Sequence, residues 1–419
     1  MPDFSDPSTR FHPLRSDEDA PIETLMAARV RAALTWGQLQ GRLAHLPPEV
    51  AHQFCAALAR LLLVEALAGS GFSGANSWFS AWFAGLEPVP DATAHVAAPA
   101  SLIADTLLAE LSLSAWAPLA DTATQIRAAA HFHRGEGTHA QHHPQHHPQQ
   151  DQREDAPAVA VAEAARLAEP PADDRTDDPG DEPGDDWPLA ALDRLHRAAA
   201  ASPHFGPTER SYQLLPLPAG PVSFEQTRTA TPLWALDLLA GPLIARSAPA
   251  TRPLPLPGAV RAEALRPELW PRERAILTAE AAGKTAQRLS DQLDAAHASV
   301  RDMQEAMTVL RSTSRAPLLY RLLAGFGPLR PLQIEKALGV SKNGVRDLVT
   351  ALVKAGLAER AAHGHHTIIR ALPRAHRAAP AAEGESRSVE TSTDATFAAF
   401  DAAMADIDRL LARTGTASE

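Results

Sequence analysis

Apolar residues recur every three or four positions along most of this chain, which is the spacing of one face of an α-helix. The first run covers residues 22–44, and its apolar positions are Leu25, Val30, Leu34, Leu39 and Leu43. A second run covers residues 49–68, and the pattern continues to residue 132. It predicts a mainly α fold with an N-terminal helical domain over residues 21–133, preceded by a disordered arm over residues 1–20.

Two local patterns in this domain raise the question of ligand binding. Residues 69–74 are rich in glycine, but no Lys-Ser or Lys-Thr follows them and no strand precedes them, so a turn between helices is favoured over a phosphate-binding loop. Residues 77–83 bring aromatic side chains together at helical spacing, which favours core packing over an effector pocket. The single cysteine, Cys55, excludes a disulfide within the chain and is typical of a reducing cytoplasm.

The composition changes after this domain. The next stretch contains acidic pairs separated by Pro and Gly, and it contains the histidines His139, His142, His143, His146 and His147. Such a composition cannot form a core, so residues 134–186 are predicted to be a disordered His-rich and acidic linker. The histidines lack a fixed spacing and a cysteine partner, so no specific metal site is predicted. Residues 187–268 are rich in proline, which predicts a strap with short helices and excludes a regular sheet interior.

A long helix is predicted over residues 269–312. Its seam follows alternating steps of four and three, through Ala275, Ala279, Ala282, Ala286, Leu289, Leu293, Ala296, Val300, Met303, Met307 and Leu310. Two partners would bury this seam equally well: the same helix of a second copy, in a homodimer, or the N-terminal helices of the same chain. Farther on, residues 373–393 are predicted to be disordered, and residues 394–413 form an amphipathic helix that we expect to dock on the long helix.

Residues 313–372 carry the signals of a winged helix-turn-helix. Helices are predicted over residues 316–326, 332–338 and 342–355. Gly339 and Val340 form the tight turn, and Ser341 is the N-cap of the third helix. Strands around the tip 363–365 complete a wing, with β-branched residues in the returning strand.

The third helix has two different faces. Apolar residues that we expect in the core are Val345, Leu348, Val349, Leu352 and Val353. The opposite face is polar and cationic, with Lys342, Asn343, Arg346, Thr350 and Lys354. Although the chain has a net charge of −11, residues 311–377 hold twelve Arg or Lys against three Asp or Glu, a balance of 12 − 3 = +9. A basic patch on an acidic protein indicates a polyanionic partner, here double-stranded DNA.

Each polar side chain of this module then receives an expected role. Asn343 and Arg346 suit adenine and guanine edges, and Thr350 lies beside them on the base-reading face. The expected phosphate contacts are Arg315, Arg330, Lys336, Ser341, Lys342 and Lys354. The expected wing contacts are Arg360, His363, His365, His366 and Arg370. Winged helices also serve as protein-interaction modules, which is the alternative for the module as a whole. For each single residue the alternative is a solvated surface charge without a partner.

The order of elements over residues 267–370 resembles a known family. After a long charged helix and the junction Arg-Ser-Thr-Ser-Arg comes P-L-Q-I-E-K-A-L-G-V-S-K-N-G-V-R-D-L-V-T-A-L-V-K-A-G-L. This is similar to uncharacterised helix-turn-helix proteins of alphaproteobacteria, and the resemblance implies a DNA-binding winged helix. The wing differs from the family, because Ala-His-Gly-His-His stands where a Gly-Arg-rich hairpin is common.

These patterns favour a DNA-binding protein, a transcriptional regulator, as the leading hypothesis. The alternatives are a non-enzymatic scaffold of DNA maintenance or partition, or a protein-interaction adaptor. No nucleophile elbow, HExxH motif or nucleotide fingerprint is present, so we expect neither an enzyme nor a cofactor. The acidic N-terminus and the apolar runs, each shorter than about 18 residues, predict a cytoplasmic protein without a membrane span. A homodimer would bind a palindromic operator.

Overall fold

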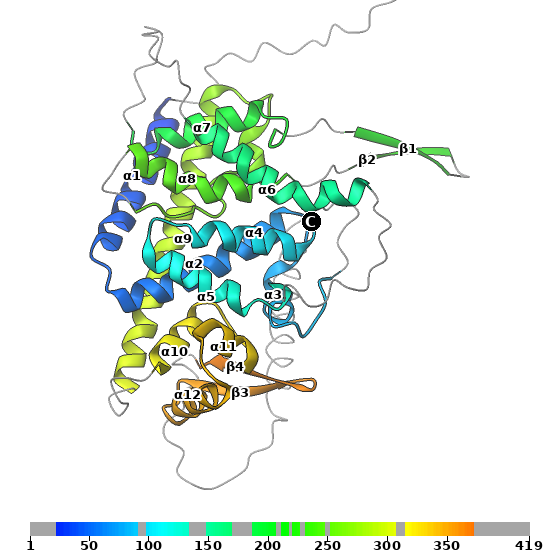
Figure 1. Ribbon diagram of the computed structural model, residues 1–419. Helices are drawn as coiled ribbons and strands as arrows, with labels where there is room; N and C mark the ends of the chain where they lie inside the picture. Colours follow the sequence, from blue (N-terminus) through cyan, green and yellow to red (C-terminus); the bar gives the residue numbers. More distant parts are fainter. Residues whose placement is uncertain are drawn as a thin grey trace, which may run out of the picture. The chain divides into compact units, whose positions relative to one another are not determined.

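The computed structural model describes residues 22–90, 98–133, 148–169, 187–206, 211–217, 220–226, 231–247, 252–306 and 315–372. This part of the chain is mainly helical, as the apolar spacing predicts (Figure 1). The expected arm over residues 1–20, the segment 373–393 and the amphipathic helix over residues 394–413 lie outside the described residues. The same holds for the five histidines at positions 139–147.

The first nine helices, α1 to α9, form what we call the helical body. Their bounds are α1 (Ile22–Ala44), α2 (Pro48–Gly69), α3 (Ala75–Phe83), α4 (Ala100–Ser112), α5 (Ala117–Ala129), α6 (Pro148–Ala168), α7 (Ala190–Ala201), α8 (Trp234–Ser247) and α9 (Pro271–Ala306), with the short 3-10 turns η1 (His131–His133) and η3 (Ala262–Leu265). α2 packs against α4, α5, α9 and further helices. It is long and apolar enough to cross a membrane, yet 67% of its apolar window is buried inside the protein. That burial is the property of a core helix.

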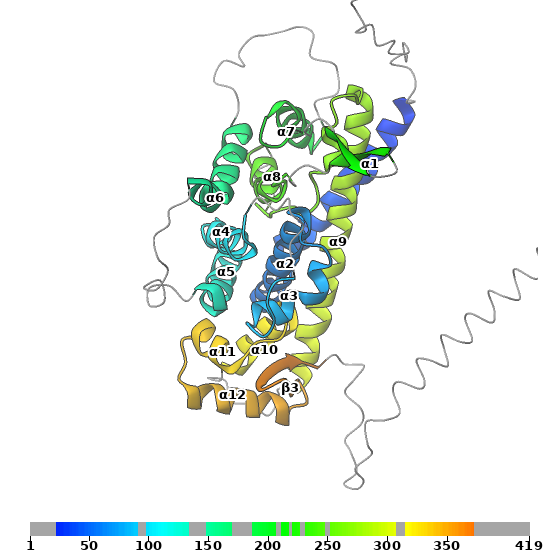
Figure 2. The same cartoon turned by 90° about the vertical axis from the view of Figure 1, so that its right-hand side faces the viewer.

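The seam of α9 is buried within the same chain. α9 packs against α1 and α2, and Figure 2 shows α1 beside it. Buried positions of the seam include Ala279, Ala282, Ala286, Leu289, Leu293, Ala296, Val300 and Met303. Small residues bring the two helices close together, since a Cβ placed on Gly283 would lie 3.5 Å from the Ala32 Cα. Among the described residues, α1 and α2 of the same chain therefore cover the seam. The seam positions Met307 and Leu310 lie outside the described residues.

The buried face of α1 differs from the predicted one. Val30 and Leu34 were expected on the apolar face, but they are 60% and 61% exposed. The buried face instead contains Ala28, Ala32 and Trp36. The seam of α9 is lined by alanine and glycine, so a row of small α1 side chains approaches it more closely than a row of leucines can.

Two segments between the body helices also differ from the prediction. Helix α6 lies inside the expected disordered linker, and its residues Ala160, Ala164 and Ala168 are buried. Alanines four residues apart form a helical seam that composition alone does not reveal. In the expected strap, strands β1 (Ser211–Leu217) and β2 (Gly220–Gln226) pair antiparallel as a two-stranded hairpin. Proline is tolerated there because both strands are edges.

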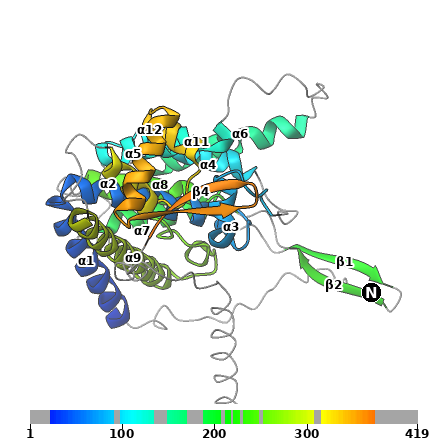
Figure 3. The ribbon, with the colours of Figure 1, turned by 90° about the horizontal axis from the view of Figure 1, so that it is seen from below.

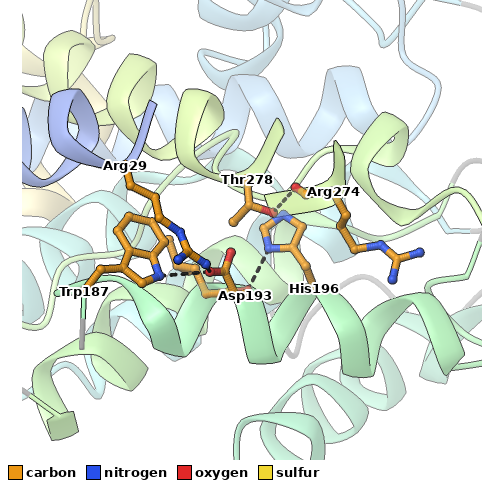
Figure 4. Close-up of polar contacts among 7 residues, drawn as sticks. Arg29, Trp187, Asp193, His196, Arg274 and Thr278 are labelled. Atoms are coloured by element: carbon orange, nitrogen blue, oxygen red, sulfur yellow. Dashed lines mark hydrogen bonds and ion pairs between the residues drawn. The ribbon is translucent and has the colours of Figure 1, made fainter. Parts of the chain in front are cut away.

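A partly buried polar cluster ties α7 to α1 (Figure 4). Asp193 accepts hydrogen bonds from Arg29 Nη2 at 3.0 Å and from Trp187 Nε1 at 2.9 Å. One turn along α7, His196 Nδ1 donates to the Leu192 carbonyl at 2.8 Å. Burial raises the pKa of Asp193 and lowers the pKa of His196 to about 4. The cluster thus keeps an ion pair and a neutral imidazole inside the helical body.

Candidate nucleic-acid interface

The elements after α9 form a second group, which we call the C-terminal module (residues 316–372). It contains α10 (Ala316–Gly325), α11 (Pro331–Leu338), α12 (Lys342–Lys354), β3 (Ala358–His363) and β4 (His366–Ala371). The turn between α11 and α12 uses Gly339 at φ 58°, a left-handed conformation that favours glycine. Ser341 caps α12, because its Oγ accepts a hydrogen bond from the Gly344 backbone N–H at 3.3 Å. The helices, the turn and the cap expected from the sequence are confirmed.

A small core holds α12 in place. Val345, Val349 and Leu352 are buried, and α12 contacts α10, α11 and β3. Leu329 adds a bridge to the edge of β4, where its N–H and carbonyl exchange hydrogen bonds with Ile369 at 3.0 and 2.8 Å. The expectation for Val353 was wrong: it is 40% exposed and lies on the outward side of the helix.

The module is packed onto the helical body through an aromatic contact. Phe326 follows α10, and its ring lies 4.7 Å from Phe83 and 5.8 Å from Phe79 between ring centroids. Arg60 Nη1 donates to the Phe326 carbonyl at 3.1 Å, and burial lowers the pKa of this guanidinium. A Cβ on Gly325 would lie 2.5 Å from the Gln53 backbone oxygen, so the α10 backbone touches α2 there. The aromatic cluster of residues 77–83 is therefore core, as the spacing favours.

Gln333 makes the second connection. Its Nε2 donates to two carbonyls of the body, that of Phe83 at 2.9 Å and that of Ala129 at 3.0 Å. These residues end α3 and α5, where helix carbonyls lack intrahelical partners. Its Oε1 accepts from the Arg330 backbone N–H at 3.0 Å, and only 2% of the residue is exposed. Sequence reasoning missed this role, because the two carbonyls come from distant parts of the chain.

The outward face of α12 remains open. All five residues expected there are exposed: Lys342, Asn343, Arg346, Thr350 and Lys354. Figures 1 and 3 show that α12 lies at the edge of the module, and its contacts are with α10, α11 and β3. Because α10 and α11 are the helices that pack on the body, the body leaves this face uncovered.

Several cations of the module are already used in internal contacts. Arg315 Nη1 donates to the Leu338 carbonyl at 2.9 Å, so it supports the end of α11 rather than standing free for a phosphate. Arg360 Nη2 donates to Thr350 Oγ1 at 3.1 Å, and Arg370 forms an ion pair with Glu359. Arg330 is half-buried at the start of α11. Among the described cations of the C-terminal module, those whose side chains make no such contact are Lys336, Lys342, Arg346 and Lys354.

The tip of the β3–β4 hairpin has both an anchored and an open side. Gly364 adopts φ 56° at the turn, as the expected hairpin requires. His363 Nε2 lies 3.1 Å from Glu87 Oε1, in the loop after α3, so this histidine faces the helical body. His365 and His366 are exposed. The tip of the hairpin therefore leaves these two histidines open to solvent.

No known family model matches the chain, and no curated protein is significantly similar to it. The resemblance of residues 267–370 to alphaproteobacterial helix-turn-helix proteins therefore stays a prediction. Among the described residues, no group of three or more His, Cys, Asp or Glu side chains can hold a metal ion.

Proposed function

We propose that the C-terminal module is a winged helix-turn-helix that binds double-stranded DNA by placing α12 in the major groove. One observation supports this most strongly: α12 presents Lys342, Arg346 and Lys354 on one exposed face, and none of them has a side-chain partner among the described residues. Asn343 lies on the same face, so the surface combines phosphate-binding and base-reading groups. A solvated surface needs no such combination on one helix face.

Each residue of the face takes a role that its position allows. Asn343 pairs with an adenine edge and Arg346 with a guanine edge. Val353 is exposed near the end of α12, beyond Asn343 and Arg346, and adds an apolar contact for a thymine methyl group. Lys342 and Lys354 neutralise phosphates at the two ends of the helix.

The contacts of α10 and α11 with the body also hold α12 in a fixed position. Phe326 and Gln333 fasten the module to the helical body, so α12 is carried by a rigid support instead of a tethered domain. Pre-positioned side chains lose less entropy when they bind. This favours sequence reading by a cytoplasmic transcriptional regulator over loose, sequence-independent attachment.

The test is selection of bound fragments from random duplex DNA, with wild-type chain beside the Asn343→Ala and Arg346→Ala double variant. We expect a defined motif for the wild type, and non-specific binding without the motif for the variant. Binding that depends on salt but selects no motif would favour a DNA-maintenance scaffold. Absence of DNA binding would refute the proposal and leave the protein-interaction adaptor.

Lysine variants provide a matched control. Lys342→Ala should reduce the slope of log K against log salt concentration by about 1, because one phosphate contact is lost. Lys284→Ala removes the same charge from α9, where Lys284 pairs with Glu280. It should leave the slope unchanged.

A further inference from the structure

One exposed face of α1 is apolar. Ile22, Met26, Val30 and Leu34 are 62%, 53%, 60% and 61% exposed, and they follow one another at four-residue steps. We call them the α1 stripe. They make up four of the nine large hydrophobic side chains exposed in the described part of the chain. Apolar side chains scattered singly over a surface are ordinary, but a row of them along one helix marks an interaction site.

The stripe lies on the side of α1 that faces away from α9. The opposite side, with Ala28, Ala32 and Trp36, is buried against the body. Figures 1 and 3 show α1 at the edge of the helical body, and its extensive contacts are with α9. The described elements of the chain therefore leave the stripe uncovered.

The charges beside the stripe are self-complementary. Glu23 and Arg31 are exposed and have no ion-pair partner among the described residues. In an antiparallel pair of α1 helices centred between Met26 and Val30, Glu23 of one copy lies about 3 Å along the axis from Arg31 of the other. A parallel pair would instead leave Glu23 of one copy and Arg31 of the other about 12 Å apart along the axis.

We propose that the α1 stripe is the self-association surface of this chain, and that two copies pair antiparallel about a two-fold axis through it. Ile22 then faces Leu34 of the second copy, and Met26 faces Val30 of the second copy. Such an isologous contact closes on itself as a dimer. A second copy fits better than an unrelated partner, because both the apolar row and the two charges match their own symmetry mates.

The surface of the pair is small. Four side chains per copy form an interface smaller than the standard of about 800 Å² per partner, and interfaces of that size are typical of weak, transient contacts. We therefore expect a reversible dimer that dissociates in the micromolar range. The proposal does not depend on DNA binding, although a dimer would carry two copies of α12.

The first test is the mass of the full chain by sedimentation equilibrium over a wide range of concentration, without DNA. The wild type should change from one chain to two. Val30→Glu with Leu34→Glu should weaken association by about tenfold or more, since two buried charges per copy repel. Leu113→Glu is the matched control, because Leu113 is 77% exposed at the end of α4. It should dimerise like the wild type.

The second test determines the orientation. Cys55 is buried and is the one cysteine of the chain, so an introduced thiol is selectively labelled. A mixture of Ile22→Cys and Leu34→Cys chains, treated with a short bis-maleimide, should cross-link mainly as mixed pairs. Mainly self-pairs would overturn the antiparallel arrangement. A wild-type chain that stays monomeric at every concentration would overturn the proposal and assign the stripe to another occupant.

Discussion

Replacing Gln333 by leucine should weaken the attachment of the C-terminal module to the helical body and destabilise the chain. The leucine side chain has a similar size but can neither donate nor accept a hydrogen bond. Three bonds disappear: from Nε2 to the Phe83 and Ala129 carbonyls, and from the Arg330 N–H to Oε1. The two carbonyls and the backbone N–H stay buried between the module and the body. Water can reach them only if the module and the body move apart.

The expected loss follows from these contacts. Each hydrogen bond contributes about 1 kcal/mol net, and a buried group left unpaired costs about 1–3 kcal/mol. The additional apolar burial of leucine offsets part of this loss. We therefore expect Gln333→Leu to lower the free energy of unfolding by about 3 kcal/mol. Gln333→Glu should be at least as harmful, because a carboxylate cannot donate to either carbonyl.

Urea denaturation, followed by the fluorescence of the tryptophans in α3, measures this change. Gln287→Leu is the control, since Gln287 is exposed on α9 and its amide contacts only a neighbouring aspartate in the described structure. It should stay within about 0.5 kcal/mol of the wild type. A Gln333→Leu variant as stable as this control would refute the reasoning, because it would mean that the two helix-end carbonyls do not need the glutamine.

Four further predictions concern close packing and buried charge. Gly325→Ala should destabilise the chain by about 1–3 kcal/mol, since its Cβ would lie 2.5 Å from the Gln53 carbonyl oxygen. Gly283→Ala, whose Cβ meets only ordinary contacts, should gain up to about 1 kcal/mol in the same denaturation assay. Burial lowers the pKa of His196 from 6.5 to about 4, so the neutral imidazole costs no stability above pH 6.5, and the free energy of unfolding falls as the pH drops from 6.5 to 4. His196→Leu should remove this acid sensitivity, which is on the order of 3 kcal/mol. The variant's free energy of unfolding should therefore vary less with pH than that of the wild type. Burial raises the pKa of Asp237 from 3.8 to about 7, so the pH dependence of stability has the opposite sign: the free energy of unfolding falls as the pH rises from 3.8 to 7. Asp237→Asn should abolish that loss, and denaturation at several pH values would detect the change. If both variants showed the same dependence of unfolding free energy on pH as the wild type, the effects assigned to burial of His196 and Asp237 would be contradicted.

The local pattern of the sequence determined the helices and much of the C-terminal module. Helical spacing, the glycine turn at Gly339 and the serine cap at Ser341 depend on interactions within a few residues, so they can be predicted from a short stretch. The two faces of α12 were predictable for the same reason, apart from Val353. The missed helix α6 had a seam of alanines, whose apolar signal is too weak to stand out in a polar stretch.

The tertiary structure decided what depends on a distant partner. The same apolar residues of α1 could face the core or solvent, and the narrow alanine seam of α9 selected the face with Ala32 and left Val30 outside. Likewise, Gln333 became a connection between module and body because two helix ends meet beside it. Burial is a property of how surfaces fit, and that fit exists only after segments far apart in the chain come together.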